Sequence, residues 1–98
     1  MAAQLIDLQT KKATIICKST LNIGRNNFFV DLCIAEPTIS RLHCRITQKA
    51  DGCYLMDLNS ANYTYLNNSI LQPNTEYRLR DGDEIRLANV RYRFAEVL

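Results

Sequence analysis

The feature that most constrains this chain is the two-residue alternation of apolar and polar side chains near its C-terminal end. Val90, Tyr92 and Phe94 fall on one face of an extended strand, and the arginines between them fall on the other. Such alternation predicts a half-buried β-strand. No stretch of ten or more residues shows the 3.6-residue apolar period of a helix. The sequence therefore predicts a β-protein with almost no helix.

Similar short segments, separated by turn signals, recur along the rest of the chain. We predict extended segments at residues 4–8, 14–17, 21–24, 44–47, 53–58, 84–87 and 90–97. Asp51-Gly52 predicts a hairpin, Asp81-Gly82-Asp83 marks another turn, and residues 84–97 predict a second hairpin. Many short strands with frequent turns are typical of a sandwich or a barrel. Residues 26–42 and 59–62 lack regular pattern and are predicted loops, where binding residues tend to lie.

Length and composition favour one domain with its own core. The 98 residues are 47% hydrophobic and 22% charged, and a chain of this size buries roughly 65% of its surface on folding. No apolar run is long enough to cross a membrane, and the N-terminus lacks the cationic start of a signal peptide. The formal net charge of +2 is small for a dedicated nucleic-acid binder.

The cysteines predict neither a metal site nor disulfides. Cys17, Cys33, Cys44 and Cys53 form no C-x-x-C pair, and the single histidine, His43, has only Cys44 as a close neighbour in sequence. We expect four reduced thiols, which is typical of a cytoplasmic protein. We also expect no cofactor.

Three polar clusters stand out at strand ends or in loops: Gly24-Arg25, Ser40-Arg41-Leu42-His43 and residues 60–67. Together they offer two guanidinium groups, several hydroxyls and amides, an inventory that suits an anion with several acceptor oxygens. Each piece also has a simpler interpretation. Arg25 can be a solvated strand end, His43 a structural hydrogen-bond hub, Ser40 a turn cap, and Asn62 and Asn67 turn residues.

The order and spacing of these clusters resemble the forkhead-associated (FHA) domain family over nearly the whole chain. Four segments carry the resemblance: Leu21-Asn22-Ile23-Gly24-Arg25 for I-G-R, Ile39-Ser40-Arg41-Leu42-His43 for S-R-x-H, Asp57-Leu58-Asn59-Ser60-Ala61-Asn62-Tyr63-Thr64 for D-x-x-S-x-N-G-T, and Leu79-Arg80-Asp81-Gly82-Asp83-Glu84-Ile85 for L-x-x-G-D-x-I. The resemblance implies an all-β sandwich of about eleven mostly antiparallel strands, with the binding loops at one end. Residues 1–98 would then be a single FHA-like domain, as in a domain excised from a longer chain.

The resemblance also implies a function and a set of site residues. The domain would bind phosphothreonine in the phosphorylated partners of a Ser/Thr kinase signalling pathway. From charge and hydropathy we expect no nucleic-acid or membrane partner, and the oligomeric state stays open, with a monomer favoured. Arg25, Ser40 and Arg41 would bind the phosphate, and Asn62 would hold the peptide main chain. The residues that would shape the loops are Gly24, His43, Ser60, Thr64 and Asn67.

Two neighbouring positions depart from the family pattern. Tyr63 stands where the family has Gly, and a left-handed backbone there would cost a tyrosine about 1–2 kcal/mol. Ala61 stands where many members have Thr or Ser. Both lie in the loop that presents Asn62, and Tyr63 is a candidate peptide contact.

Three alternatives remain beside the phosphothreonine interpretation. A scaffold of the same fold that binds without phosphate is favoured by the altered loop around Asn62. Nucleic-acid binding would use the outward arginines, but acidic residues in the same segment offset their charge; these arginines are Arg78, Arg80, Arg86, Arg91 and Arg93. An enzyme would need a nucleophile activated by a base, and no group that would orient His43 is identifiable.

Overall fold

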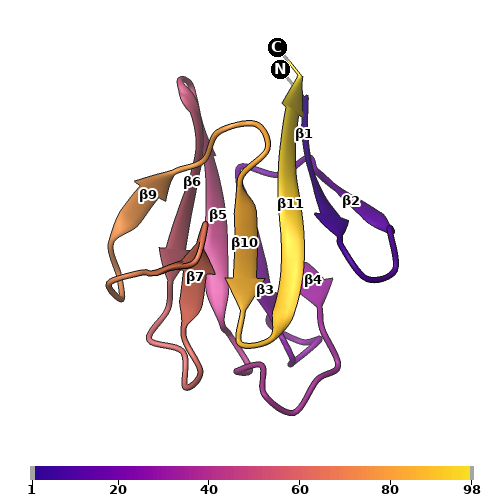
Figure 1. Cartoon of the computed structure of the whole chain (residues 1–98), viewed down its shortest axis with the longest axis vertical. Coiled ribbons are helices and arrows are strands. Elements are labelled where there is room, and N and C mark those ends of the chain that lie inside the picture. The colour runs from indigo at the N-terminus through magenta and orange to yellow at the C-terminus, as the bar shows by residue number, and fades with distance from the viewer. Residues whose placement is uncertain (1, 98) are drawn as a thin grey trace.

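Eleven strands form two sheets in the computed structural model, which describes residues 2–97 (Figure 1). The strands are β1 (Ala2–Asp7), β2 (Ala13–Ile16), β3 (Thr20–Gly24), β4 (Leu32–Cys33), β5 (Cys44–Lys49), β6 (Gly52–Asp57), β7 (Thr64–Leu66), β8 (Ser69–Ile70), β9 (Glu76–Arg78), β10 (Glu84–Leu87) and β11 (Val90–Val97). Residues 2–97 contain no helix, which confirms the all-β prediction. It follows that this part of the chain has no helix that could cross a membrane.

The two sheets pack as a sandwich. One has the strand order β2-β1-β11-β10-β7-β8, and the other has the order β4-β3-β5-β6-β9. All the paired strands are antiparallel except β3 and β4. The expected sandwich of about eleven mostly antiparallel strands is therefore confirmed.

The predicted hairpins are present with short connections. Strands β5 and β6 pair from Cys44 opposite Asp57 to Lys49 opposite Gly52, and β10 and β11 pair through Leu87 opposite Val90. The pattern did not predict β4, a two-residue strand inside the expected loop at residues 26–42. Nor did it predict that the strands nearest the two termini, β1 and β11, pair along their length.

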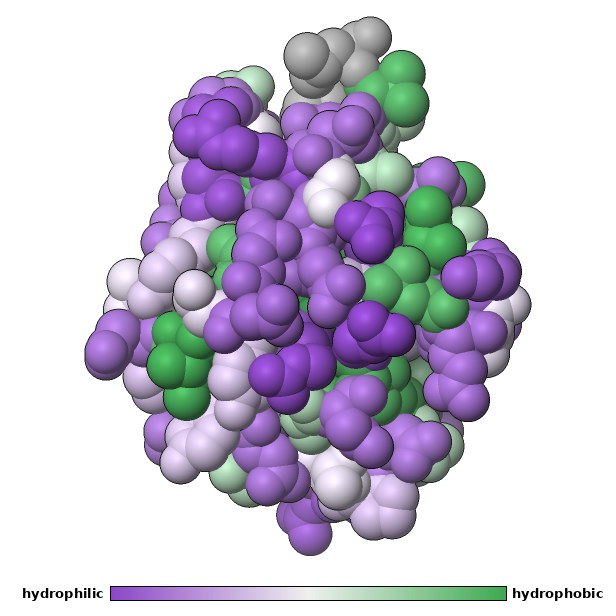
Figure 2. All heavy atoms as spheres, viewed as in Figure 1, coloured by the Kyte–Doolittle hydropathy of each residue, from purple (hydrophilic) through white to green (hydrophobic). Residues whose placement is uncertain are grey.

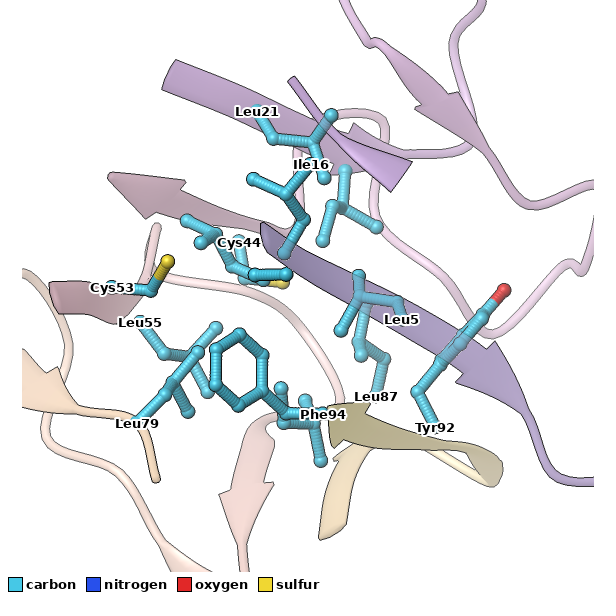
Figure 3. Packing of buried hydrophobic residues seen from close by; sticks show 14 of the residues in the cluster. Leu5, Ile16, Leu21, Cys44, Cys53, Leu55, Leu79, Leu87, Tyr92 and Phe94 are labelled. Atoms are coloured by element: carbon cyan, nitrogen blue, oxygen red, sulfur yellow. The ribbon is translucent and has the colours of Figure 1, made fainter. Parts of the chain in front are cut away.

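The core lies between the sheets and is built from the inward positions of the alternating strands. Phe94 is completely buried and lies near Leu55 of the opposite sheet and near Leu79, which directly follows β9 (Figure 3). Two of the four free cysteines, Cys44 and Cys53, are part of this core, and burial raises the pKa of both thiols. These two sulfur atoms therefore pack as small apolar groups.

The connections β3–β4, β4–β5 and β6–β7 lie at the end of the sandwich opposite the two termini (Figure 1). The sheets hold the ends of these loops in place. The residues that the sequence predicted for the site lie in these loops or at the strand ends that flank them, Gly24 ending β3 and Thr64 beginning β7, with one exception. The exception is Asn67.

Candidate functional site

Gly24, the last residue of β3, lets the β4–β5 loop approach the strand end closely. A Cβ atom at this position would lie 2.2 Å from the carbonyl oxygen of Arg41. Two backbone hydrogen bonds join the next two residues to the same loop. Arg25 N–H donates to the Ser40 carbonyl at 3.0 Å, and Asn26 N–H donates to the Arg41 carbonyl at 3.2 Å. Gly24 thus brings Arg25 beside Ser40 and Arg41.

An open hollow of about 380 Å³ lies where these loops meet. Its lining residues are Arg25, Pro37, Thr38, Ile39, Ser40, Arg41, Leu42, Ala61 and Asn62. Arg25 donates from Nε to the Ile39 carbonyl at 2.9 Å, which holds the guanidinium, and the Arg25 side chain is exposed. The Ser40 hydroxyl oxygen accepts the Ala61 N–H at 3.0 Å, so its own proton can be donated to a ligand. The structure therefore brings together the three residues that the sequence predicted for phosphate.

His43 is completely buried and holds the loops together through both ring nitrogens. The Ser40 N–H donates to Nδ1 at 3.1 Å, which requires Nδ1 to be the acceptor. Nε2 then carries the proton and donates it to the Tyr63 carbonyl at 3.0 Å. Since the backbone occupies both nitrogens, His43 is not placed to take a proton from the Ser40 hydroxyl. Its role is that of the structural hub.

The burial of His43 makes the stability of the domain depend on pH. Burial lowers the pKa of His43 below the ordinary value, outweighing the Tyr63 carbonyl and Asp57, which raise it. The unfolded chain therefore binds this proton more readily. The contribution of neutral His43 to the free energy of unfolding should be fully present above about pH 6.5. It should be lost as the pH falls through the lowered pKa of His43 in the folded domain.

We expect urea unfolding at pH 5 to show a lower free energy of unfolding than at pH 7.5. His43→Gln should be less stable at pH 7.5 but should show a smaller change between the two pH values. Because His43 is the only histidine in the chain, an equal change in both proteins would contradict this assignment.

A buried carboxylate at the end of β6 organises the β6–β7 loop. Asp57 Oδ1 accepts hydrogen bonds from the hydroxyls of Ser60 and Thr64, the latter at 2.7 Å, and Oδ2 accepts the Ser60 N–H at 3.2 Å. All three side chains are buried. Ser60 and Thr64 therefore hold the β6–β7 loop in shape from its buried side, and both donate to the Asp57 carboxylate.

Asn62 crosses from this loop to the β4–β5 loop. Its side-chain Nδ2 donates to the Thr38 carbonyl at 2.8 Å, and the Thr38 hydroxyl donates to Asn89 at 3.1 Å. Sequence reasoning gave Thr38 no role, because an isolated threonine in a loop carries no spacing signal. In the structure it links the two loops that border the hollow.

Asn67 does not belong to the hollow. It lies just beyond the far end of β7, where Nδ2 donates to Asp83 at 3.0 Å and Oδ1 accepts the Glu84 N–H at 2.9 Å. These bonds brace the β9–β10 connection and not the binding loops. The sequence motif placed Asn67 only five residues after Asn62, but β7 carries the chain away between them.

Tyr63 adopts the left-handed backbone that the family pattern reserves for Gly, with a φ of 67°. Its carbonyl accepts from His43 and from the Ala88 N–H at 3.2 Å, so two contacts hold this geometry. The side chain is half-exposed, at 51%. The structure thus combines backbone strain with an aromatic ring that is available at the binding end.

We expect Tyr63→Gly to separate these two effects. Glycine removes the left-handed penalty of about 1–2 kcal/mol and adds up to about 1 kcal/mol of unfolded-state entropy, so the free energy of unfolding should rise by roughly 0.5–1 kcal/mol. Binding of a phosphothreonine peptide should weaken, because the aromatic contact is lost.

Tyr63→Ala is the matched control, since it removes the ring and keeps the strain. It should weaken binding without stabilising the fold. Unchanged affinity in both variants would show that the ring does not touch the peptide.

The outward arginines of the C-terminal strands are largely engaged within the domain. Arg86 lies over the Tyr65 ring, 3.7 Å from its centre, and Arg91 lies 3.7 Å from Glu84. Arg93 donates to the Gly82 carbonyl at 2.9 Å. The face that includes β10 and β11 is mostly hydrophilic (Figure 2). These contacts favour a solvated sheet face over a nucleic-acid interface.

The match to a family model agrees with this architecture. The FHA domain model matches residues 21–88, more than half of the chain. The chain belongs to the FHA domain family. This FHA domain is 38% identical over 69 residues to an FHA domain-containing protein of Arabidopsis thaliana, a match that covers 70% of this chain and 18% of that protein. The chain spans about a fifth of the length of the curated relatives that it matches first.

Solved FHA domains have the same fold. One, from a study of phosphothreonine-dependent FHA domain interactions, is 27% identical, with a TM-score of 0.89 over 100% of this chain and 99% of that one. The MEK1 FHA domain, solved with a phosphothreonine peptide of HOP1, is 30% identical, with a TM-score of 0.82 over 95% of this chain and 94% of that one.

Proposed function

We propose that this FHA domain is an interaction module that binds phosphothreonine in partner proteins phosphorylated by a Ser/Thr kinase. The observation that carries the proposal is the convergence of Arg25, Ser40 and Arg41 on one open hollow. The complex of the MEK1 FHA domain with a phosphothreonine peptide supports it from a related fold.

The chemistry of the hollow suits a phosphate group. Phosphothreonine carries about −1.5 to −2 charges at neutral pH and offers three strong acceptor oxygens. The Arg25 guanidinium is held through Nε, so its terminal N–H groups can meet two of these oxygens. The Ser40 hydroxyl supplies a further short donor. Arg41 adds a second positive charge at the rim.

Asn62 supports a second candidate function. Its Nδ2 donates to the Thr38 carbonyl, so a peptide main chain must either displace this bond or use the amide oxygen. The strained Tyr63 follows directly. This arrangement favours a scaffold that binds its partner without phosphate. The intact phosphate side of the hollow favours the phosphothreonine module.

A peptide titration distinguishes the two functions. A degenerate phosphothreonine library would first identify a binding sequence, and calorimetry would then compare that peptide with its unphosphorylated form. Hydrogen bonds to charged groups contribute roughly 1.5–3 kcal/mol each, so removing the phosphate should weaken binding at least about 100-fold. Equal affinities would contradict the phosphothreonine function and support the scaffold.

The same peptide with phosphoserine tests the choice of residue. Burying the threonine methyl group should contribute about 0.8 kcal/mol, which is about fourfold in affinity. We therefore expect the phosphothreonine form to bind about fourfold more tightly. Equal binding of the two forms would show that the hollow recognises the phosphate alone.

A further inference from the structure

A cavity of about 450 Å³, larger than the hollow at the loop end, opens between the β1–β2 connection, strand β4 and the start of β11. Strands β2 and β4 are edge strands of the two opposite sheets, so we call this space the edge cavity. Among residues 2–97, none of the residues that line it also lines the hollow around Arg25. The lining residues that matter here are Asp7, Leu32, Ile34, Glu36, Val90 and Tyr92.

The inner face of one sheet becomes polar where it reaches the edge cavity. Leu5 and Phe94 lie opposite each other on β1 and β11, and both are buried in the core. The next inward pair along the same two strands is Asp7 and Tyr92, and both line the edge cavity. Directly opposed residues of a sheet point to the same face, so the Asp7 carboxylate and the Tyr92 ring are neighbours there.

Tyr92 directs an unused hydroxyl into the edge cavity. The residue is only 6% exposed, yet its hydroxyl makes no hydrogen bond within residues 2–97. Figure 3 shows the hydroxyl oxygen pointing away from the apolar cluster. Burial raises the pKa of Tyr92 to about 12, and Asp7 acts in the same direction, so the hydroxyl stays protonated at neutral pH. Polar groups at such depth usually have a partner, and this hydroxyl can give or accept a hydrogen bond from a ligand.

The charged groups around the edge cavity favour a cation. Neither Asp7 nor Glu36 has an ion-pair partner among residues 2–97. Asp7 Oδ1 accepts the N–H groups of Gln9 at 2.8 Å and of Thr10 at 3.1 Å, which leaves Oδ2 for a ligand. Lys12 also lines the cavity, so two carboxylates and one ammonium give the lining a net charge of −1. A positively charged ligand is therefore favoured over an anion.

The remaining lining suits an aliphatic stem. Leu32 of β4, Ile34 just after it and Val90 at the start of β11 supply apolar walls. An arginine side chain combines a methylene stem with a planar guanidinium, whose N–H donors match carboxylate and hydroxyl oxygens. Pockets that hold small ligands have volumes of roughly 300–1,000 Å³, so the edge cavity has room for such a side chain.

We propose that the edge cavity binds an arginine side chain of a partner protein, at a site separate from the hollow at the loop end and independent of phosphate. The guanidinium meets Asp7, Glu36 and the Tyr92 hydroxyl, and the stem packs on the apolar walls. The domain then has two recognition sites of opposite charge. The loop end offers arginines to an anion, and the sheet edge offers carboxylates to a cation.

The probe is a short peptide, capped at both ends, with a single arginine among uncharged residues. Titration of the isotope-labelled domain, followed through its backbone amide chemical shifts, should show changes at Thr14, Leu32 and Tyr92. Citrulline in place of the arginine keeps the shape but removes the charge, and should weaken binding about tenfold. Lysine should also bind more weakly, because it lacks the planar fork. Arg25→Ala should bind the arginine peptide normally.

Two variants test the lining residues. Tyr92→Phe removes only the hydroxyl and should weaken arginine-peptide binding about two- to tenfold without lowering the thermal unfolding temperature. Glu36→Gln removes an exposed carboxylate and should weaken binding about two- to fivefold. Glu76→Gln is the matched control, because Glu76 lies on β9, at the opposite edge of the sheet from β4. It should leave the affinity unchanged.

Several results would overturn the inference. These are equal binding of the arginine peptide and either its citrulline or its lysine form, shift changes confined to the loop end, and unchanged affinity in both Tyr92→Phe and Glu36→Gln. A lower unfolding temperature in Tyr92→Phe would show that the hydroxyl serves the fold. Dimerisation that Glu36→Gln abolishes would identify the occupant as an arginine of a second copy. Failure of the phosphothreonine function would leave this inference standing, since the two sites have different lining residues.

Discussion

Replacing Arg25 with alanine should weaken phosphothreonine-peptide binding by about 30- to 150-fold, a loss of roughly 2–3 kcal/mol. The Arg25 side chain is exposed at the hollow. Within residues 2–97, its guanidinium makes one hydrogen bond, from Nε to the Ile39 carbonyl. Removing it should therefore take away a charged contact with several donors and leave the sandwich folded. Calorimetric titration with one phosphopeptide measures the effect, and thermal unfolding checks the fold.

Two further variants identify the origin of this loss. Arg25→Lys keeps the charge but removes both the Nε bond and the planar fork, so it should bind between the unmodified domain and Arg25→Ala. Arg80→Ala removes an exposed arginine between β9 and β10, outside the hollow, and should leave affinity unchanged. Equal losses in Arg25→Ala and Arg80→Ala would indicate a nonspecific charge effect. Unchanged affinity in Arg25→Ala would remove the phosphate-binding hypothesis and leave the scaffold.

The sequence could predict those parts of the fold that depend on local pattern. The alternation of Val90, Tyr92 and Phe94 places Tyr92 and Phe94 in the core. Asp51-Gly52 lies where β5 turns into β6, because a tight turn needs residues that tolerate unusual backbone angles. Pairing between distant segments has no such local signal. The pairing of β1 with β11 follows from packing over the whole chain.

In the candidate site, too, some features could be predicted from the sequence and others depend on how distant segments pack. The resemblance to the FHA family implied that Arg25, Ser40 and Arg41 share one site, and in the structure all three line one hollow. The position of Asn67 depends on where β7 runs, and the link from Thr38 to Asn62 depends on how two loops meet. Neither can be read from residue types. The left-handed backbone at Tyr63 was expected from the family pattern, and the structure retains it despite the tyrosine.

Gly24 should be one of the positions most sensitive to substitution in this domain. We expect Gly24→Ala to lower the free energy of unfolding by roughly 3 kcal/mol and to abolish most phosphopeptide binding. The reason is steric, because the backbone at Gly24 is not left-handed. The added methyl would lie 2.2 Å from the Arg41 carbonyl oxygen, 2.7 Å from its carbon and 3.0 Å from the Leu42 Cα, all backbone atoms that cannot rotate away.

Relief of this clash requires the β4–β5 loop to move, which would break the backbone bonds that place Ser40 and Arg41 beside Arg25. Stability and binding should therefore fall together. Gly82→Ala is the matched control, because a methyl there meets no atom within 4 Å, although the φ of 90° is unfavourable for alanine. It should lower the free energy of unfolding by about 1 kcal/mol and leave affinity unchanged, since Gly82 lies outside the hollow. Urea unfolding and peptide titration of both variants measure these effects. A Gly24→Ala domain that binds normally would show that the close approach of the two loops is not what assembles the phosphate site.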